Sequence, residues 1–279
     1  MRLLRWAAAA AAPAVLLTGL FSASPARATV ARPGTPARIY PNKDCLAPTV
    51  PLYGGAMWDT TVGLPPQAWL GIANWGANTQ NSAAGGPGTA YNYDDAVTIT
   101  SAQQEGTPIM GYIATGYGTS ASGYTQADIE AQMTDWSSWY GVTKFFFAQV
   151  PTATTYRPYY AALKNWAHAH IGSSSRVWLE MGGYPAASSW MNDASVIMDW
   201  EGGTAPAAPP SWVYNYKSDR FAMIMNAVPD TASAIAAAVA AMEGSHAGHG
   251  FVTSDPTYQT LPSWAYWTTF ANDAALGCR

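Results

Sequence analysis

The chain has 279 residues and a formal net charge of −4 at pH 7, from 13 lysines and arginines against 17 aspartates and glutamates. Charged residues make up only 11% of the sequence and aromatic residues 13%. Because the cations form no basic stripe that would release counterions from a phosphate backbone, we expect no nucleic-acid partner.

The N-terminal segment has the pattern of a signal peptide over residues 1–28. Arg2 and Arg5 form a basic start, an apolar run follows from Trp6 to Phe21, and Ala26–Ala28 offers a small-x-small cleavage site. The apolar run is shorter than the ~20 residues that span a bilayer. We therefore predict cleavage after Ala28, a secreted protein, and no stable membrane insertion of the mature chain.

Residues 29–44 contain three prolines and no apolar periodicity, which predicts a flexible leader before one domain over residues 45–279. A mature length of about 250 residues is typical of one α/β barrel rather than two small domains. Cys45 and Cys278 lie near the two ends of this domain, and an exported protein meets an oxidising environment. We predict a disulfide between them, which stabilises the fold by up to ~5 kcal/mol. Two buried free thiols are the alternative.

Short apolar runs alternate with helical patterns along the domain, and each run predicts a strand. These runs are Val50–Tyr53, Trp69–Asn74, Pro108–Ala114, Lys144–Phe147, Val177–Glu180, Val196–Trp200, Phe221–Asn226 and Gly250–Ser254. Runs buried on both faces are typical of parallel strands, and helices between them complete an α/β pattern. The sequence therefore predicts a single (β/α)8 TIM-like barrel rather than an antiparallel sandwich.

The helices between these runs carry their own start signals. Thr125–Asp128 can form a capping box, and the residues after it repeat on one helical face: Ile129, Met133, Trp136 and Tyr140. Asp230 is expected to cap a helix over Thr231–Glu243, with Gly244 just beyond its end. Pro262 is expected to start a final helix.

Barrel enzymes carry their active sites at the carboxyl ends of the strands, so the residues that end each run are the candidate site. These residues are polar or aromatic, which suits a sugar: ring faces stack on Trp and Tyr, while amides and carboxylates bind hydroxyls. The predicted substrate-binding residues are Tyr53, Asn74, Tyr112, Tyr117, Trp200, Asn226 and Trp264. The expected partner is an extracellular polysaccharide.

Several segments, in this order along the chain, resemble one known family. They are Val50–Tyr53, Asn74 with Gly86-Pro87-Gly88, Pro108–Gly118, Lys144–Thr152, Trp200-Glu201-Gly202, Phe251–Asp255 and Leu261–Trp264. Over nearly all of the mature chain, the sequence resembles the spherulin-4 (spherulation-specific family 4) proteins, grouped with glycoside hydrolase family 135.

The resemblance implies a barrel glycosidase that cleaves α-linked, partly N-acetylated galactosamine polymers. Its functional carboxylates would be an acidic pair at the end of strand four and a glutamate on strand six. The family stretch usually reads Phe-Phe-Asp-Glu-Val-Pro, but this chain has Ala148 and Gln149 at the acidic pair. Alanine has no ionisable group and an amide cannot give up a catalytic proton, so these positions are degenerate and the family mechanism cannot operate unchanged.

Three other carboxylates are catalytic candidates. Glu201 matches the family glutamate; the alternative is a structural carboxylate. Glu180 ends the adjacent strand where relatives usually have asparagine, so a Glu180/Glu201 pair would restore two-carboxylate chemistry; the alternative is a surface glutamate. Asp255 is the third candidate. The sequence leaves open whether the protein is an enzyme with an altered site, a non-catalytic glycan-binding protein, or a structural protein of a wall or spore coat.

Four histidines raise the question of a metal site. His168 and His170 lie on one predicted helix, and His246 and His249 lie in a glycine-rich loop. No second ligand motif accompanies either pair, so solvated histidines are the preferred interpretation. We expect neither a metal nor a cofactor.

Overall fold

The computed structural model describes residues 46–53, 70–74, 85–104, 106–118, 124–257 and 263–276. The predicted signal peptide, the leader, Cys45 and Cys278 lie outside the described residues, as do the side chains of Tyr53 and Trp264. Within these ranges, no helix has the length and hydropathy needed to span a membrane.

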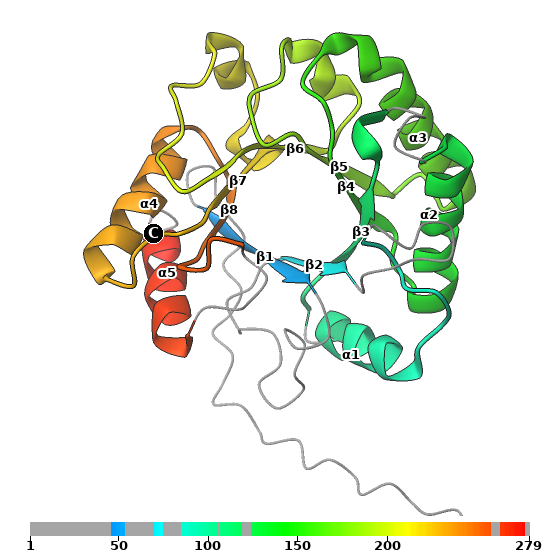
Figure 1. Ribbon diagram of the computed structural model, residues 1–279, viewed down its shortest axis with the longest axis horizontal. Coiled ribbons are helices and arrows are strands. Elements are labelled where there is room, and N and C mark those ends of the chain that lie inside the picture. The colour runs from blue at the N-terminus through cyan, green and yellow to red at the C-terminus, as the bar shows by residue number, and fades with distance from the viewer. Residues whose placement is uncertain are drawn as a thin grey trace, which may run out of the picture. The chain divides into compact units, whose positions relative to one another are not determined.

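Eight parallel strands close into a barrel in sequence order, and β1 pairs with β8 (Figure 1). The strands are β1 (Ala47–Tyr53), β2 (Leu70–Asn74), β3 (Ile109–Ala114), β4 (Lys144–Ala148), β5 (Arg176–Glu180), β6 (Val196–Gly202), β7 (Phe221–Met225) and β8 (His249–Val252). Each predicted run coincides with one of these strands. The predicted (β/α)8 TIM-like barrel is confirmed.

Helices cover the outside of the ring. They are α1 (Tyr93–Gln104), α2 (Gln126–Tyr140), α3 (Arg157–His170), α4 (Ala232–Gly244) and α5 (Trp264–Leu276). The predicted capping box of α2 is confirmed: Thr125 Oγ1 accepts the Asp128 N–H at 3.2 Å, and Asp128 Oδ2 accepts the Thr125 N–H at 2.9 Å. The predicted apolar face of α2 is buried.

The expected start of α4 is wrong by one residue. Thr231 rather than Asp230 caps the helix, because Thr231 Oγ1 accepts the Ala234 N–H at 3.3 Å. Either residue type can cap a helix, so sequence preference alone does not choose between neighbours. Gly244 is the last helical residue rather than the first one beyond the helix, and Ser245 forms the cap.

One quarter of the barrel has short 3-10 turns in place of full helices. Turn η5 (Ser188–Asn192) connects β5 to β6, and turns η6 (Ser211–Asn215) and η7 (Ser218–Arg220) connect β6 to β7. In Figure 1 this quarter contains loops and short turns, whereas α2 and α3 cover the neighbouring strands. The barrel flank is therefore less regular beside β6 than beside β3 and β4.

Aromatic side chains fill the barrel and its helical layer. The rings of Trp178 on β5 and His249 on β8 lie 4.7 Å apart, and because these strands are not neighbours, the rings meet inside the barrel. Outside it, a Cβ on Gly111 of β3 would lie 2.5 Å from the Trp136 indole, so α2 packs on β3 only because residue 111 is glycine. The interior is thus a packed core, and a site must lie at its rim.

Candidate active site

A β-bulge in β6 determines which side chains face the barrel axis. Met198 pairs with Ala222 on β7 but Trp200 pairs with Met223, so Asp199 is an extra residue. Side chains alternate between the two faces of a strand, and one extra residue reverses the alternation beyond it. Glu201, rather than Trp200, therefore continues the face of Met198.

Glu180 occupies the same face on the neighbouring strand. It ends β5 and pairs in register with Met198. Trp178, two residues earlier on β5, points into the barrel. The bulge in β6 thus brings Glu201 to the same side as Glu180 at the carboxyl ends of adjacent strands, where barrel enzymes place their chemistry.

A side-chain hydrogen bond between Glu180 and Glu201 is one of the causes that raise the pKa of Glu180. Two carboxyl groups can form such a bond only when one of them carries a proton. Burial raises the pKa of Glu180 to about 7, the Gln149 N–H that Glu180 Oε2 accepts at 2.9 Å lowers it in part, and the charge of Glu201 raises it further. Near neutral pH the pair therefore holds a proton that it can donate.

Tyr112 on β3 is the third polar side chain at this position. Burial, followed by the charge of Glu180 and a smaller effect of Glu201, raises the pKa of the Tyr112 hydroxyl far above its usual range. The hydroxyl therefore stays protonated and can donate a hydrogen bond to a carboxylate or a substrate oxygen.

Gln149 stands where the family has an acidic residue, and its hydrogen bonds position the neighbouring residues. Its backbone is left-handed, with φ at 60°, and its N–H donates to Glu180. Its Oε1 accepts the Gly116 N–H at 3.2 Å, and its carbonyl accepts the N–H of Tyr117 at 2.9 Å. Tyr117 is also left-handed, with φ at 59°, and its side chain is 57% exposed. Such strained conformations cluster at functional sites.

Ala148, the other degenerate position, is only 3% exposed. Its carbonyl accepts the Thr115 hydroxyl at 2.8 Å, and Thr115 also bonds the hydroxyl of Tyr160 at 2.7 Å. A carboxylate at position 148 would therefore enter a packed and bonded environment rather than an open rim.

The remaining predicted binding residues are held by their own loops. Asn74 Oδ1 accepts the Gly86 N–H at 2.9 Å, so this side chain shapes the predicted glycine-rich turn. Asn226 Nδ2 donates to the Pro256 carbonyl at 2.8 Å. Trp200 Nε1 donates to the Thr204 carbonyl at 3.1 Å, on the strand face opposite Glu201. The structure gathers Glu180, Glu201, Tyr112 and Gln149 into one cluster, and the Tyr117 N–H donates to the Gln149 carbonyl beside it.

Asp255, the third candidate carboxylate, folds back on its own loop. Its Oδ1 accepts the N–H of Thr257 at 2.8 Å and the Thr257 hydroxyl at 2.7 Å, and its own N–H donates to Thr253. This is an Asx-type turn, which gives the carboxylate a local structural task.

Asp199 is a residue that sequence reasoning missed. It is fully buried, and within the described ranges neither of its carboxyl oxygens has a hydrogen-bond partner. Burial raises its pKa well above the usual range. A bulge of this kind has no residue signature, so the sequence held no signal for it.

The expectation of solvated histidines is wrong for His249, which is 6% exposed and begins β8 rather than lying in a loop. The His170 ring stacks on Trp166 at 4.6 Å, His246 Nε2 lies 2.8 Å from the Tyr216 carbonyl, and burial lowers the pKa of His249 to about 4. Over the described ranges, no three metal-ligating side chains gather.

The cluster limits the chemistry that this conformation can perform. A hydrogen bond holds the two carboxyl groups closer than the ~5 Å or more that separates the carboxyl groups flanking a glycosidic bond. The pair can donate a proton as it stands. For a second task, such as stabilising a cationic sugar, Glu201 must move away from Glu180 or the substrate must enter between them.

The solved structures that this chain resembles include Sph3, chitinases and a chitinase-like agglutinin. Sph3 of Aspergillus clavatus, solved with GalNAc, matches with a TM-score of 0.63 and 17% identity, over 85% of this chain and 99% of Sph3. A chitinase from Chromobacterium violaceum matches with a TM-score of 0.55 and 9% identity, over 83% and 99%. A chitinase-like agglutinin from Robinia pseudoacacia matches with a TM-score of 0.52 and 8% identity, over 81% and 99%. At these identities the matches establish the fold.

The search of curated proteins finds no match to this sequence. The sequence model of the spherulation-specific family 4 matches residues 77–274, which is well over half of the chain. The barrel, the order of its motifs and this match agree: the chain belongs to the spherulation-specific family 4.

Proposed function

We propose that the protein is a secreted glycoside hydrolase acting on an extracellular amino-sugar polysaccharide of the galactosamine/N-acetylgalactosamine type. One observation carries the proposal: a proton-sharing Glu180/Glu201 pair lies at the carboxyl end of a barrel whose usual acidic pair is replaced. Family membership and the GalNAc complex of Sph3 support the amino-sugar substrate. The N-terminal signal pattern supports secretion.

In this mechanism Glu180 is the general acid. Its pKa of about 7 keeps a proton available at neutral pH, and that proton passes to the glycosidic oxygen as the bond breaks. Glu201, freed from the pair, stabilises the positive charge that develops at the anomeric carbon or activates a water. Tyr112 donates a hydrogen bond beside them, and the exposed Tyr117 ring offers a face for a sugar.

The second candidate is a glycan-binding protein without turnover. The observation that favours it is the interaction of the two glutamates with each other, because the carboxyl groups that flank a glycosidic bond lie ~5 Å or more apart. The agglutinin with the same fold bears a name that denotes binding. A structural role in a wall or coat is a third possibility that the fold permits.

The test incubates the secreted protein with N-acetylated and de-N-acetylated galactosamine polymers and measures both new reducing ends and retention on the polymer. We expect Glu201→Gln to lower reducing-end release by about 10²–10⁴-fold with retention preserved, because the amide keeps the shape and removes the charge. Glu130→Gln is the matched control, since Glu130 lies on the outside of α2 and bonds Gln126.

The outcomes separate the candidates. Turnover by the wild type that survives Glu201→Gln would remove Glu201 from catalysis. Retention without turnover in the wild type would establish the binding protein. Neither turnover nor retention on either polymer would reject the proposed substrate.

A further inference from the structure

An open recess of about 470 Å³ lies on the barrel flank where short turns replace helices. Its lining residues are Lys164, Arg176, Met191, Asn192, Ala194, Ser195 and Arg220. Arg176 begins β5, Ser195 precedes β6 and Arg220 precedes β7. The recess therefore lies toward the amino ends of these strands, away from Glu180 and Glu201 at their carboxyl ends.

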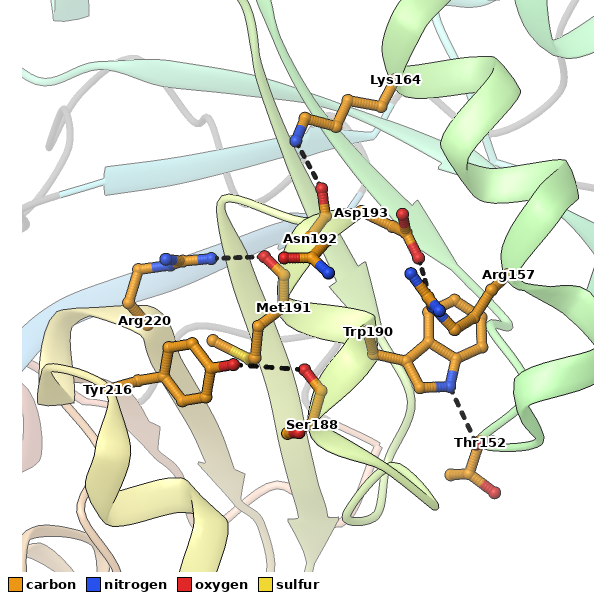
Figure 2. A network of polar contacts seen from close by, with 10 residues as sticks. All are labelled: Thr152, Arg157, Lys164, Ser188, Trp190, Met191, Asn192, Asp193, Tyr216 and Arg220. Atoms are coloured by element: carbon orange, nitrogen blue, oxygen red, sulfur yellow. Dashed lines mark hydrogen bonds and ion pairs between the residues drawn. The ribbon is translucent and has the colours of Figure 1, made fainter.

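Backbone carbonyls hold the cations of this recess in place. Lys164 Nζ donates to the Asn192 carbonyl at 2.7 Å, and Arg220 Nη2 donates to the Met191 and Ala194 carbonyls at 2.8 and 2.9 Å. Figure 2 shows Lys164 and Arg220 reaching the η5 segment from different sides. The cations are thus ordered before any ligand arrives, which lowers the entropy cost of binding.

Donor groups remain available after these bonds. Arg176 uses Nη1 for the Ser174 and Ser175 carbonyls, at 3.2 Å each, which leaves Nε and Nη2. Arg220 uses Nε and Nη2, which leaves Nη1. Lys164 uses one of its three ammonium donors. A guanidinium with free N–H groups binds oxyanions with good geometry.

No carboxylate balances these charges within the described part of the chain. The lining contains three cations and no acidic residue, and none of the three forms an ion pair there. The nearby Asp193 is paired with Arg157 at 2.6 Å, as Figure 2 shows. Lys144 on the neighbouring strand pairs in register with Arg176, and burial followed by the charge of Arg176 lowers its pKa.

We propose that this recess binds an oxyanion group (carboxylate, sulfate or phosphate), either free or carried on a polysaccharide. Tethering of η5 explains the bonds to carbonyls, but it does not explain three unpaired cations in one recess of a chain with net charge −4. The volume is many times the ~30 Å³ share of one water, so the recess accommodates a sugar unit that carries the anion. The site is separate from the glutamate pair and does not depend on the proposed hydrolase activity.

The experiment titrates the secreted protein with sodium phosphate, sodium sulfate and oligogalacturonate at constant ionic strength, and follows the backbone amide NMR signals of Asn192 and Ser195. We expect saturable shifts at millimolar concentrations. Arg176→Gln and Lys164→Gln should each weaken binding roughly tenfold or more, because each removes a charge-assisted hydrogen bond. Lys217→Gln, which removes a cation that does not line the recess, should leave binding unchanged.

The three ligands distinguish the sources of the anion. Saturation by oligogalacturonate alone indicates a polymer-borne carboxylate, and saturation by phosphate or sulfate as well indicates a general oxyanion site; both support the proposal. Absence of saturation by all three, or equal weakening by Lys217→Gln, would overturn it. Arg176 is exposed at the start of its strand, so Arg176→Gln decides the question if Lys164→Gln does not fold.

Discussion

The two ends of strands β5 and β6 each bring residues of like charge together, but in different surroundings. At the carboxyl ends, two half-buried glutamates interact, and burial followed by the charge of Glu201 raises the pKa of Glu180 to about 7. Toward the amino ends, three cationic side chains line an open recess, and backbone carbonyls accept hydrogen bonds from them. Burial removes a charge, whereas exposure keeps it and leaves it free to attract a partner. The same strands thus support a proton donor at one end and an anion attractor near the other.

Adding a carboxylate to each end would test this contrast, and the largest effect is expected from Ala148→Asp. Ala148 is 3% exposed, so a carboxyl group there would be buried without a prepared partner. We expect the free energy of unfolding to fall by about 2–5 kcal/mol, as measured by urea denaturation. Faster hydrolysis by this variant than by the wild type, alone or with Gln149→Glu, is therefore not expected without a compensating change.

The matched change is Asn192→Asp, which adds a carboxylate among the cations of the recess. Asn192 is exposed, and surface ion pairs contribute little, so we expect a change in stability within about 1 kcal/mol. The same variant should weaken oxyanion binding. A loss of stability equal to that of Ala148→Asp would show that the two ends do not differ as described.

The pH dependence of stability would sharpen the contrast next. The pKa of Glu180 is raised from the ordinary value of 4.5 to about 7 in the folded protein, so between these values the folded state holds a proton that the unfolded chain releases. The stability that Glu180 contributes to the folded state is fully present below about pH 4.5 and is lost as the pH rises through about 7.

The difference in unfolding free energy between the wild type and Glu180→Gln isolates this contribution, because buried Asp199 has a raised pKa in both proteins. We expect the difference to change between about pH 4.5 and 7 by up to about 3 kcal/mol. A difference that is constant over this range would contradict the proton-holding pair. The catalytic rate should decline above the same pKa.

The smallest expected effect comes from Gln149→Gly. Glycine adopts the left-handed backbone without strain, but it loses the bond from Gln149 Oε1 to the Gly116 N–H. These effects oppose each other, so we expect stability within about 1 kcal/mol of the wild type together with weaker polymer retention, because the Tyr117 loop loses its support. Ala227→Gly is the control, since Ala227 is left-handed with φ at 53° and has no polar side chain. Retention equal to that of the wild type would remove Gln149 from substrate positioning.

The sequence predicts the barrel well because burial on both faces makes each strand a continuous apolar run. The Phe145–Phe147 run, for example, is fully buried in β4. The capping box of α2 is equally readable, since it depends on two residue types at a fixed spacing. The choice between Asp230 and Thr231 as a cap depends on local geometry that composition does not contain.

The candidate site could be predicted only in part. Glu180 and Glu201 are identified by their positions at strand ends, but their contact depends on the bulge at Asp199. The left-handed backbone of Gln149 has no sequence signal, because glutamine rarely adopts it. The cationic recess was not predicted at all: Lys164, Arg176 and Arg220 come from separate elements that only the closed barrel brings together.

The bulge also has a consequence for how relatives of this protein are compared. Successive side chains of a strand alternate between its two faces, and the motif Trp-Glu-Gly at residues 200–202 does not show which face each of them takes. A relative with the same three letters but one residue fewer between Met198 and Trp200 would turn its tryptophan to the axis and its glutamate to the outer layer. Counting residues from the start of β6, rather than matching the motif, is therefore the measure of whether a family member retains this acid.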